Sequence, residues 1–190
     1  MSKKVLMIIG SLRKDSFNKQ LAQKAAVLLQ DKNMEVSFLE YGDLPFMNQD
    51  IEYPAPEAVS RVRKEVGQAD GVWFFSPEYN FSYSGVLKNL LDWLSRALDP
   101  NDYMKGSYIS DKKAAISGAA GRSGAAGSRA RLRELLKVLR VRLLDEEVGI
   151  ALSGESFQSG SLVLSEEDNI ILAKQVDAFV KFLDEQDIEK

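Results

Sequence analysis

The sequence predicts an α/β protein, a single domain in which helices cover both faces of a doubly wound, five-stranded parallel sheet. Two observations support this fold class. Short, continuous apolar runs, typical of strands buried on both faces, alternate with longer segments whose apolar residues recur at helical spacing. The chain of 190 residues, 45% of them hydrophobic, also shows no linker, repeat or low-complexity segment. We therefore expect residues 1–190 to form one domain.

Residues 4–9 predict the first buried strand, and a helix is expected from about residue 19, with an apolar face of Leu21, Ala25, Leu28 and Leu29. A short second strand follows at residues 35–39. Three prolines then punctuate a long connection at residues 41–56, which we interpret as a surface segment. Residues 58–69 predict a modestly amphipathic helix.

The loop between the first strand and the first helix is a candidate anion site. It contains Ser11, Arg13, Ser16 and Asn18 directly before a helix N-terminus. Free backbone N–H groups and the positive end of the helix dipole favour an anion there, and Arg13 can add a bidentate contact to a phosphate. The loop has neither the glycine-lysine-hydroxyl ending of a Walker loop nor the glycines of a dinucleotide fingerprint. The alternative is that Ser16 or Asn18 simply caps the helix.

A strand, loop and helix unit stands at the centre of the sequence. The apolar run at residues 72–75 ends at Pro77, because proline lacks a backbone donor and restricts the residue before it. A polar and aromatic loop covers residues 78–83. Ser84 is the expected N-cap of the next helix, whose apolar positions are Leu87, Leu90, Leu91 and Leu94.

The remaining elements complete the alternation. Residues 114–117 predict a short strand, residues 118–127 a glycine-rich loop, and residues 129–139 a helix. The fifth strand is expected at residues 142–151. The closing helix at residues 165–184 begins with an acidic, capped first turn.

Five strands that alternate with helices favour the flavodoxin-like strand order 2-1-3-4-5, whose switch point lies between the first and third strands. The loops at residues 11–13, 77–80 and 118–124 would then flank one crevice. The first loop suits a phosphate, and the second carries aromatic, amide and carboxyl groups suited to a flat heterocycle. The third is small enough to let a ring approach the backbone. Together they indicate a mononucleotide with a large planar ring.

The composition excludes several classes of function. The chain has no histidine and no cysteine, which rules out a Ser-His-Asp hydrolase, thiol chemistry and the usual zinc and iron–sulfur ligand sets, so no metal site is expected. A net charge of −3 gives no electrostatic case for nucleic-acid binding. No apolar segment is long enough to span a bilayer, and the first residues lack the cleavage region of a signal peptide. We expect no membrane partner and a cytoplasmic protein.

At this point the sequence resembles the NADPH-dependent FMN reductase family, including its quinone- and azo-reducing members. The matching pieces are Gly10-Ser-Leu-Arg13 with Ser16 and Asn18, then Ser76-Pro-Glu-Tyr-Asn80, then Gly85 with Leu87-Lys-Asn89 and Asp92-Trp93, and the loop at residues 117–124. Two departures stand out. Ser84 replaces a proline common among relatives, and Ala119 and Ala120 lie among the glycines of the last loop.

The resemblance implies a flavin site with three groups of residues. The FMN phosphate would be held by Ser11, Arg13, Ser16 and Asn18, one edge of the isoalloxazine by Pro77, Glu78, Tyr79 and Asn80, and its other edge by Ser117, Gly118 and Gly121. NADPH or NADH would give a hydride to the flavin. The reduced flavin would then pass electrons to a small-molecule acceptor such as a quinone, an azo compound or free flavin, by a ping-pong mechanism. No protein side chain is assigned as a catalytic acid or base, and the family suggests a homodimer or homotetramer.

Three other functions share parts of this sequence pattern. A flavodoxin-type electron carrier, without its own NAD(P)H reductase activity, remains the alternative. A CheY-like phosphoacceptor domain requires an acidic pair after the first strand and an aspartate after the third, where this chain has Ser11 and Ser76. A dehydrogenase that binds pyrophosphate at the loop of Gly118 is disfavoured, because no acidic residue follows the next strand as that fold requires.

Overall fold

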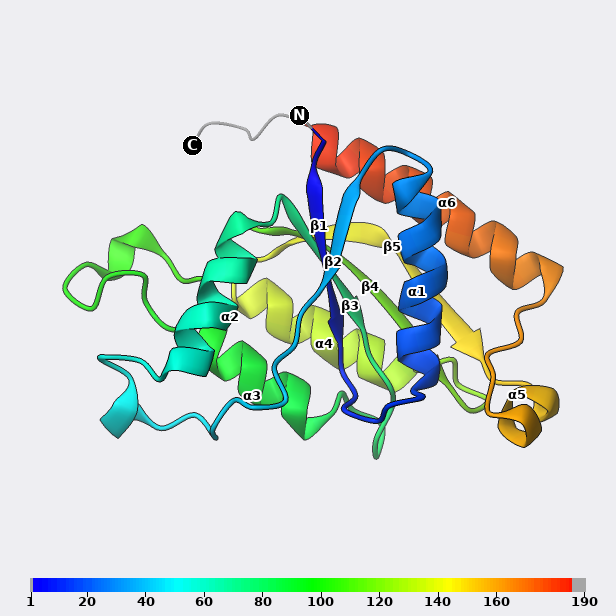
Figure 1. The fold of residues 1–190 in the computed structure, drawn as a ribbon, viewed down its shortest axis with the longest axis horizontal. Helices are drawn as coiled ribbons and strands as arrows, with labels where there is room; N and C mark the ends of the chain where they lie inside the picture. Colours follow the sequence, from blue (N-terminus) through cyan, green and yellow to red (C-terminus); the bar gives the residue numbers. More distant parts are fainter. Residues whose placement is uncertain (1, 186–190) are drawn as a thin grey trace.

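The computed structural model describes residues 2–185 and contains a single five-stranded sheet surrounded by helices (Figure 1). The elements in chain order are β1 (Lys4–Ile9), α1 (Phe17–Gln30), β2 (Glu35–Phe38), the 3₁₀ turn η1 (Gln49–Ile51), α2 (Glu57–Gln68), β3 (Gly71–Phe75), α3 (Gly85–Leu94), the 3₁₀ turn η2 (Tyr103–Lys105), β4 (Lys113–Ala120), α4 (Ala126–Val138), β5 (Arg142–Ala151), α5 (Gly154–Ser159) and α6 (Glu166–Asp184).

The strand order is β2-β1-β3-β4-β5, and every neighbouring pair is parallel, as predicted. The ends of the central strands are level, because Ile9 of β1 lies opposite Phe75 of β3, and Phe75 lies opposite Ser117 of β4. The loops that follow β1 and β3 therefore leave the sheet side by side, at its lower edge in Figure 1. This is the switch point, where doubly wound proteins bind their ligands.

The two faces of the sheet carry separate apolar cores. Trp73 and Phe75 of β3 pack with α1 and α6 on one face, whereas Val72 and Phe74 pack with α2, α3 and α4 on the other. All four side chains are fully buried. Burial on both faces explains why the sequence of β3 is an unbroken apolar run and not an alternation of apolar and polar residues.

A chain of buried polar groups crosses the core between β3 and α6. Trp73 Nε1 donates to Ser117 Oγ at 3.0 Å, and Ser117 Oγ donates to Gln175 Oε1 at 2.7 Å. The amide nitrogen of Gln175 donates at 2.9 Å to the backbone oxygens of Ile116 and Glu146. These last contacts lie where the register of β4 and β5 shifts, so Gln175 satisfies backbone groups that the irregular ladder does not pair.

The long connector at residues 41–56 is attached to α3. The oxygen of Pro45 accepts hydrogen bonds from Asn89 Nδ2 at 2.9 Å and from Trp93 Nε1 at 2.8 Å, and the N–H of Met47 donates to Asn89 Oδ1 at 2.8 Å. The Leu-Lys-Asn and Asp-Trp pieces of the sequence thus have a structural use: they fix the connector beside the helix.

Helices α1 and α4 begin at Phe17 and Ala126, two and three residues before their predicted starts, and two further differences concern β4 and α5. Strand β4 continues to Ala120, three residues beyond the predicted end, because its small residues pair with β5 as far as Ala151. Gly118 therefore lies within a strand and not in a loop. Helix α5 was not predicted, since its six residues carry little apolar pattern; Ser153 caps it by accepting a hydrogen bond from the N–H of Ser156.

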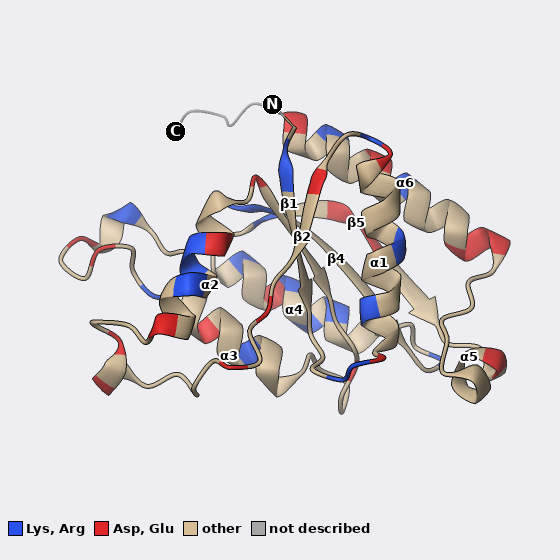
Figure 2. Ribbon diagram, viewed as in Figure 1, with Lys and Arg blue, Asp and Glu red and all other residues tan. Residues whose placement is uncertain are grey.

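Among residues 2–185, no helix combines the length and the apolar character that a membrane crossing requires. Basic and acidic residues are interspersed over the helices (Figure 2).

Candidate active site

The loops after β1 and β3 meet at Gly10. Its N–H donates to the oxygen of Phe75 at 2.8 Å, and a Cβ atom added to Gly10 would lie 3.0 Å from Pro77 Cδ and 3.3 Å from Leu87 Cδ2. A larger residue would push the first loop away from the second. The glycine therefore sets the close approach of the two loops at the crevice.

The start of helix α3 is closed by Ser84. Its hydroxyl accepts a hydrogen bond from the N–H of Leu87 at 3.3 Å and donates to the oxygen of Gly10 at 2.6 Å. Ser84 is 2% exposed, so this link between the first loop and α3 is inaccessible to solvent. The predicted N-cap is confirmed, and the hydroxyl adds a contact that proline could not make.

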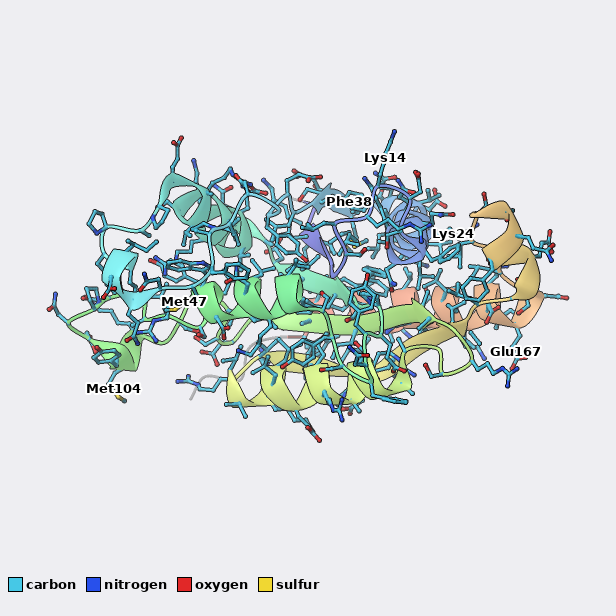
Figure 3. All side chains as sticks on the ribbon, turned by 90° about the horizontal axis from the view of Figure 1, so that it is seen from below. Lys14, Lys24, Phe38, Met47, Met104 and Glu167 are labelled. Carbon is cyan, nitrogen blue, oxygen red and sulfur yellow. The ribbon has the colours of Figure 1, made fainter. Side chains whose placement is uncertain are left out.

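The start of helix α1 is open. Ser16 is the N-cap residue with extended backbone, but its side chain makes no capping hydrogen bond, and the first turn carries no acidic residue. Helical geometry leaves the first N–H groups without intrahelical partners. Arg13 is exposed, with its guanidinium carbon 5.3 Å from the centre of the Phe17 ring. The neighbouring Lys14 extends away from the body of the protein (Figure 3).

A cavity of about 300 Å³ adjoins this helix start. Its lining includes Ser11, Arg13 and Lys19 on one side and Tyr41 and Gly42 on the other. Ser11 Oγ accepts a hydrogen bond from the N–H of Arg13 at 3.3 Å. The loop is thus curled back on itself, with hydroxyl and cationic groups near the open N-terminus of α1.

Asn18, by contrast, is a structural residue of this helix. Its Nδ2 donates to the oxygen of Ala119 at 2.9 Å, and the N–H of Ala119 donates to its Oδ1 at 2.8 Å. The side chain is 2% exposed. Both amide atoms are therefore used to hold the first turn of α1 against the end of β4.

The start of helix α4 is closed by a residue from another loop. Glu78, which follows β3, accepts a hydrogen bond from the N–H of Ser128 at 3.0 Å and from the hydroxyl of Ser123 at 2.9 Å. The N-cap position of α4 is Ala125, which has no side-chain oxygen and a φ of 60°. The carboxylate of Glu78 thus takes the place of the missing cap.

The environment of Glu78 favours the ionised carboxylate. Burial by itself would raise its pKa, but hydrogen bonds from Ser128, Ser123 and the N–H of Gly127 lower it, and the positive charge of Arg129 adds to this effect. The balance keeps the pKa of Glu78 below its usual value. A hydrogen bond of 2.8 Å between the hydroxyls of Ser76 and Ser128 joins the same two segments.

The rest of the second loop is a tight hairpin. The backbones of Tyr79 and Ser82 exchange hydrogen bonds of 2.9 and 3.1 Å, and both residues between them have positive φ, 52° at Asn80 and 59° at Phe81. This is the geometry of a type I′ turn. Arg131 of α4 donates to the oxygen of Phe81. Tyr79 and Phe81 remain 53% and 73% exposed, so the hairpin presents aromatic rings at the crevice.

The three predicted residues around β4 lie in different surroundings. The hydroxyl of Ser117 is buried and bonded to Trp73 and Gln175, so it does not face the crevice. A Cβ atom at Gly118 would lie 2.6 Å from the oxygen of Ser76, which shows that this glycine is needed for packing. A Cβ atom at Gly121 would meet nothing within 4 Å. Only this third position has open space beside it.

The structure therefore divides the predicted residues by their surroundings. Those whose polar groups or rings are at least partly exposed are Ser11, Arg13, Tyr79 and Asn80, with open space beside Gly121; Ser16 makes no capping hydrogen bond but is only 4% exposed. Those that build the frame are Asn18, Pro77, Glu78, Ser117 and Gly118. Sequence reasoning missed the contributions of Ser123 and Ser128, because nothing local marks them as partners of a carboxylate about fifty residues earlier.

These surroundings fit a ligand with one phosphate and one planar ring. Of the helices that follow β1, β3 and β4, α3 is capped by Ser84 and α4 by Glu78, whereas α1 has no side-chain cap. Among these three helix starts, only that of α1 is left for an anion, and exposed aromatic side chains and an open glycine lie in the neighbouring loops. This arrangement is that of a doubly wound protein with a mononucleotide site at its switch point.

Comparison with known proteins specifies the class. Residues 3–154 match the model of the NADPH-dependent FMN reductase family. An NAD(P)H-dependent FMN reductase of Pseudomonas aeruginosa is 36% identical over 178 residues, 92% of each chain, and a 2-hydroxy-1,4-benzoquinone reductase of a Burkholderia species is 32% identical over 96% of this chain and 97% of the relative. The solved structure of FerB, a flavoenzyme NAD(P)H:acceptor oxidoreductase from Paracoccus denitrificans, superposes with a TM-score of 0.82 at 35% identity, covering 95% of this chain and 97% of FerB.

The chain belongs to the NADPH-dependent FMN reductase family. It is an oxidoreductase with FMN and NAD(P)H as its cofactors, as the sequence predicts. Within residues 2–185 there is no group of three or more acidic side chains placed to hold a metal ion.

Proposed function

We propose that this protein transfers a hydride from NADPH or NADH through bound FMN to a quinone or a similar small oxidised molecule, in a ping-pong cycle. The observation that carries the proposal is the open N-terminus of α1 beside two closed ones. It provides one anion site at the switch point of the sheet, where a flavin phosphate can bind. The similarity to an NAD(P)H-dependent FMN reductase supports a nicotinamide donor, and the similarity to a 2-hydroxy-1,4-benzoquinone reductase supports a quinone acceptor.

In this proposal the phosphate binds to the first N–H groups of α1, to the hydroxyls of Ser11 and Ser16, and to the guanidinium of Arg13. The ring lies between the hairpin of Tyr79 and Asn80 and the loop of Gly121. Asn18 and Glu78 act through their hold on the surrounding elements, since their polar atoms are bonded elsewhere.

When bound, FMN supplies the redox chemistry, and the chain's own residues bind it, orient it and shape the space for the second substrate. The rings of Tyr79 and Phe81 are exposed, so a nicotinamide and then an acceptor would be able to bind beside this hairpin in turn. Alternation of both substrates at one place is the physical basis of a ping-pong cycle. Azo compounds and free flavin are further flat acceptors that such a space can admit.

An anaerobic visible spectrum of the FMN-loaded protein tests the proposal. We expect the flavin bands to bleach when NADPH is added and to return when 1,4-benzoquinone follows. Bands that persist with NADPH would identify a flavodoxin-type electron carrier instead. A protein that binds no flavin after reconstitution would contradict both functions.

The phosphate assignment is tested separately with Arg13→Ala. A charged contact contributes about 1.5–3 kcal/mol, so FMN should bind about tenfold to a hundredfold more weakly in a fluorescence titration. Lys24→Ala is the matched control, because this exposed lysine of α1 lies outside the cavity that Arg13 lines. Equal FMN affinity in the wild type and Arg13→Ala would show that the phosphate binds elsewhere.

We also propose that the protein acts in the cytoplasm as a homodimer or homotetramer. The apolar faces of α3 and α4 are used within the chain, because Leu87, Leu90 and Leu132 are fully buried in its core. The exposed side chains of Phe46 and Met104 are better candidates for a contact between subunits. Light scattering of the eluted protein measures the subunit number, and a single chain mass would contradict the proposal.

A further inference from the structure

Both carboxylate oxygens of Glu78 form hydrogen bonds to another loop and helix of the protein. This residue lies in the loop after β3, yet both of its carboxylate oxygens are bonded to the segment that follows β4. One oxygen accepts from the hydroxyl of Ser123 at 2.9 Å and the other from the N–H of Ser128 at 3.0 Å. The carboxylate therefore spans the two loops that flank the proposed position of the flavin ring.

The partner helix depends on this contact. Helix α4 starts at Ala126 after a left-handed Ala125, which cannot supply a capping oxygen. The N–H of Ala126 donates to the oxygen of Ser123, but those of Gly127 and Ser128 would otherwise be unsatisfied, and the positive end of the helix dipole would face no counter-charge. A carboxylate from outside the helix satisfies both needs.

The space around the carboxylate is closely filled. A Cβ atom at Gly127 would lie 3.1 Å from Glu78 Oε2 and 3.0 Å from the oxygen of Phe81. Arg131, one turn further along α4, donates to that same oxygen. The hairpin after β3 is thus attached to the first two turns of α4 at several points, and the carboxylate is the charged one.

We propose that Glu78 is a positioning residue, whose carboxylate caps α4 from the neighbouring loop and thereby fixes the separation of the two loops across the crevice. The effect on catalysis rests on the proposed function, because it requires the flavin ring to lie between these loops. The cap itself does not. Loss of the carboxylate should disturb the position of the flavin ring more than the binding of the phosphate, since the phosphate would be held at α1.

The cap is tested on the FMN-free protein by hydrogen exchange at the N–H groups of Gly127 and Ser128. In Glu78→Gln and Glu78→Ala we expect these amides to exchange about fivefold to tenfold faster, as for the loss of a helix cap. Sodium formate, compared with sodium chloride at equal ionic strength, should restore protection in Glu78→Ala by filling the vacated anion position. Glu134→Gln, an exposed change on α4, is the matched control.

The exchange result decides the first half of the proposal. Wild-type exchange at both amides in the two Glu78 variants, or an equal effect in Glu134→Gln, would overturn the cap. Ser123→Ala, at an exposed position, removes one hydrogen-bond donor to the same carboxylate. This variant tests the cap if Glu78→Ala does not fold. It should increase exchange at the same two amides by a smaller factor.

The positioning role is tested on the FMN-loaded protein by the rate of flavin reduction at saturating NADPH. We expect Glu78→Gln to lower this rate about tenfold while changing the FMN dissociation constant by less than about threefold, and formate to raise the rate in Glu78→Ala. A wild-type rate in both variants would overturn the positioning role. If the wild type itself bound no FMN, the proposed function would be wrong. The hydrogen-exchange measurement on the FMN-free protein would still test whether Glu78 caps α4.

Discussion

Helices α1 and α4 begin at the same edge of the sheet, after loops that each contain serine and arginine, and differ in what meets their N-terminal N–H groups. Ser16 stands at the start of α1 and makes no capping hydrogen bond. At α4 the carboxylate of Glu78 fills the corresponding position. Both starts attract an anion by the same physics, but only α1 can accept one from solution. A helix N-terminus is thus a ligand site only where the protein has not already supplied the anion.

The two starts are also connected through the end of β4. Asn18 in the first turn of α1 holds Ala119, and Gly118 packs against Ala125 at the start of α4. The open start therefore has a fixed position relative to the closed one.

Asn18→Ala should destabilise the FMN-free protein by about 2–4 kcal/mol, because it leaves a buried N–H and a buried oxygen of Ala119 without partners. Urea unfolding measures the loss. Asn169→Ala, which removes one exposed amide hydrogen bond, should cost less than about 1 kcal/mol. Equal losses in the two variants would mean that the tie between α1 and β4 is not important for stability.

Ser16→Asp would give α1 the kind of internal anion that α4 already has. We expect FMN to bind about tenfold to a hundredfold more weakly, as for the loss of a charged contact of about 1.5–3 kcal/mol. Thermal unfolding should show that the FMN-free protein keeps or gains stability, by up to about 1 kcal/mol. Gln23→Glu adds the same charge on an exposed part of α1 and should leave FMN affinity unchanged. Comparable weakening in both variants would point to net charge alone.

Glu78→Gln should lower stability by about 1–2 kcal/mol near pH 7, the usual value of a helix cap. Hydrogen bonds from α4 and the charge of Arg129 hold the folded-state pKa of Glu78 below its usual value despite partial burial. Such a group stabilises the fold above its unfolded pKa of about 4.3, and that contribution is lost as pH falls through the folded pKa. The difference between wild type and variant should therefore shrink in urea titrations below about pH 4. A constant difference down to pH 3 would contradict an ionised cap.

Phe81→Gly should raise stability by about 1 kcal/mol, because Phe81 has a φ of 59° that costs a residue with a side chain about 1–2 kcal/mol. Its ring is 73% exposed and recovers little of this cost by packing. Asn80→Gly is the comparison, and its gain should be smaller since asparagine tolerates positive φ. Thermal unfolding measures both, and a stability loss in Phe81→Gly would show that the ring is packed in solution.

Much of the fold could be predicted because its signals are local. The residues of β1 and β5 were predicted with their observed bounds, and Ser84 and Ser165 are the caps that the pattern indicates. Prediction was weaker where long-range pairing decides. The run at residues 118–120 looks like a flexible loop, and only its pairing with β5 makes it strand.

The sequence alone determined which chemical groups this protein has available: no histidine or cysteine, a hydroxyl and arginine loop after the first strand, and a polar, aromatic loop after the third. It also favoured the strand order 2-1-3-4-5, which the structure confirms, because right-handed crossovers allow few alternatives. Only the tertiary structure decided which of those groups remain free. The structure uses the side chains of Asn18, Glu78 and Ser117 in hydrogen bonds to partners about fifty to a hundred residues away. By contrast, the side chain of Ser16 makes no capping hydrogen bond, and that of Arg13 is exposed. The reason is physical: a hydrogen bond between distant segments depends on where the fold brings them, and no local pattern records it.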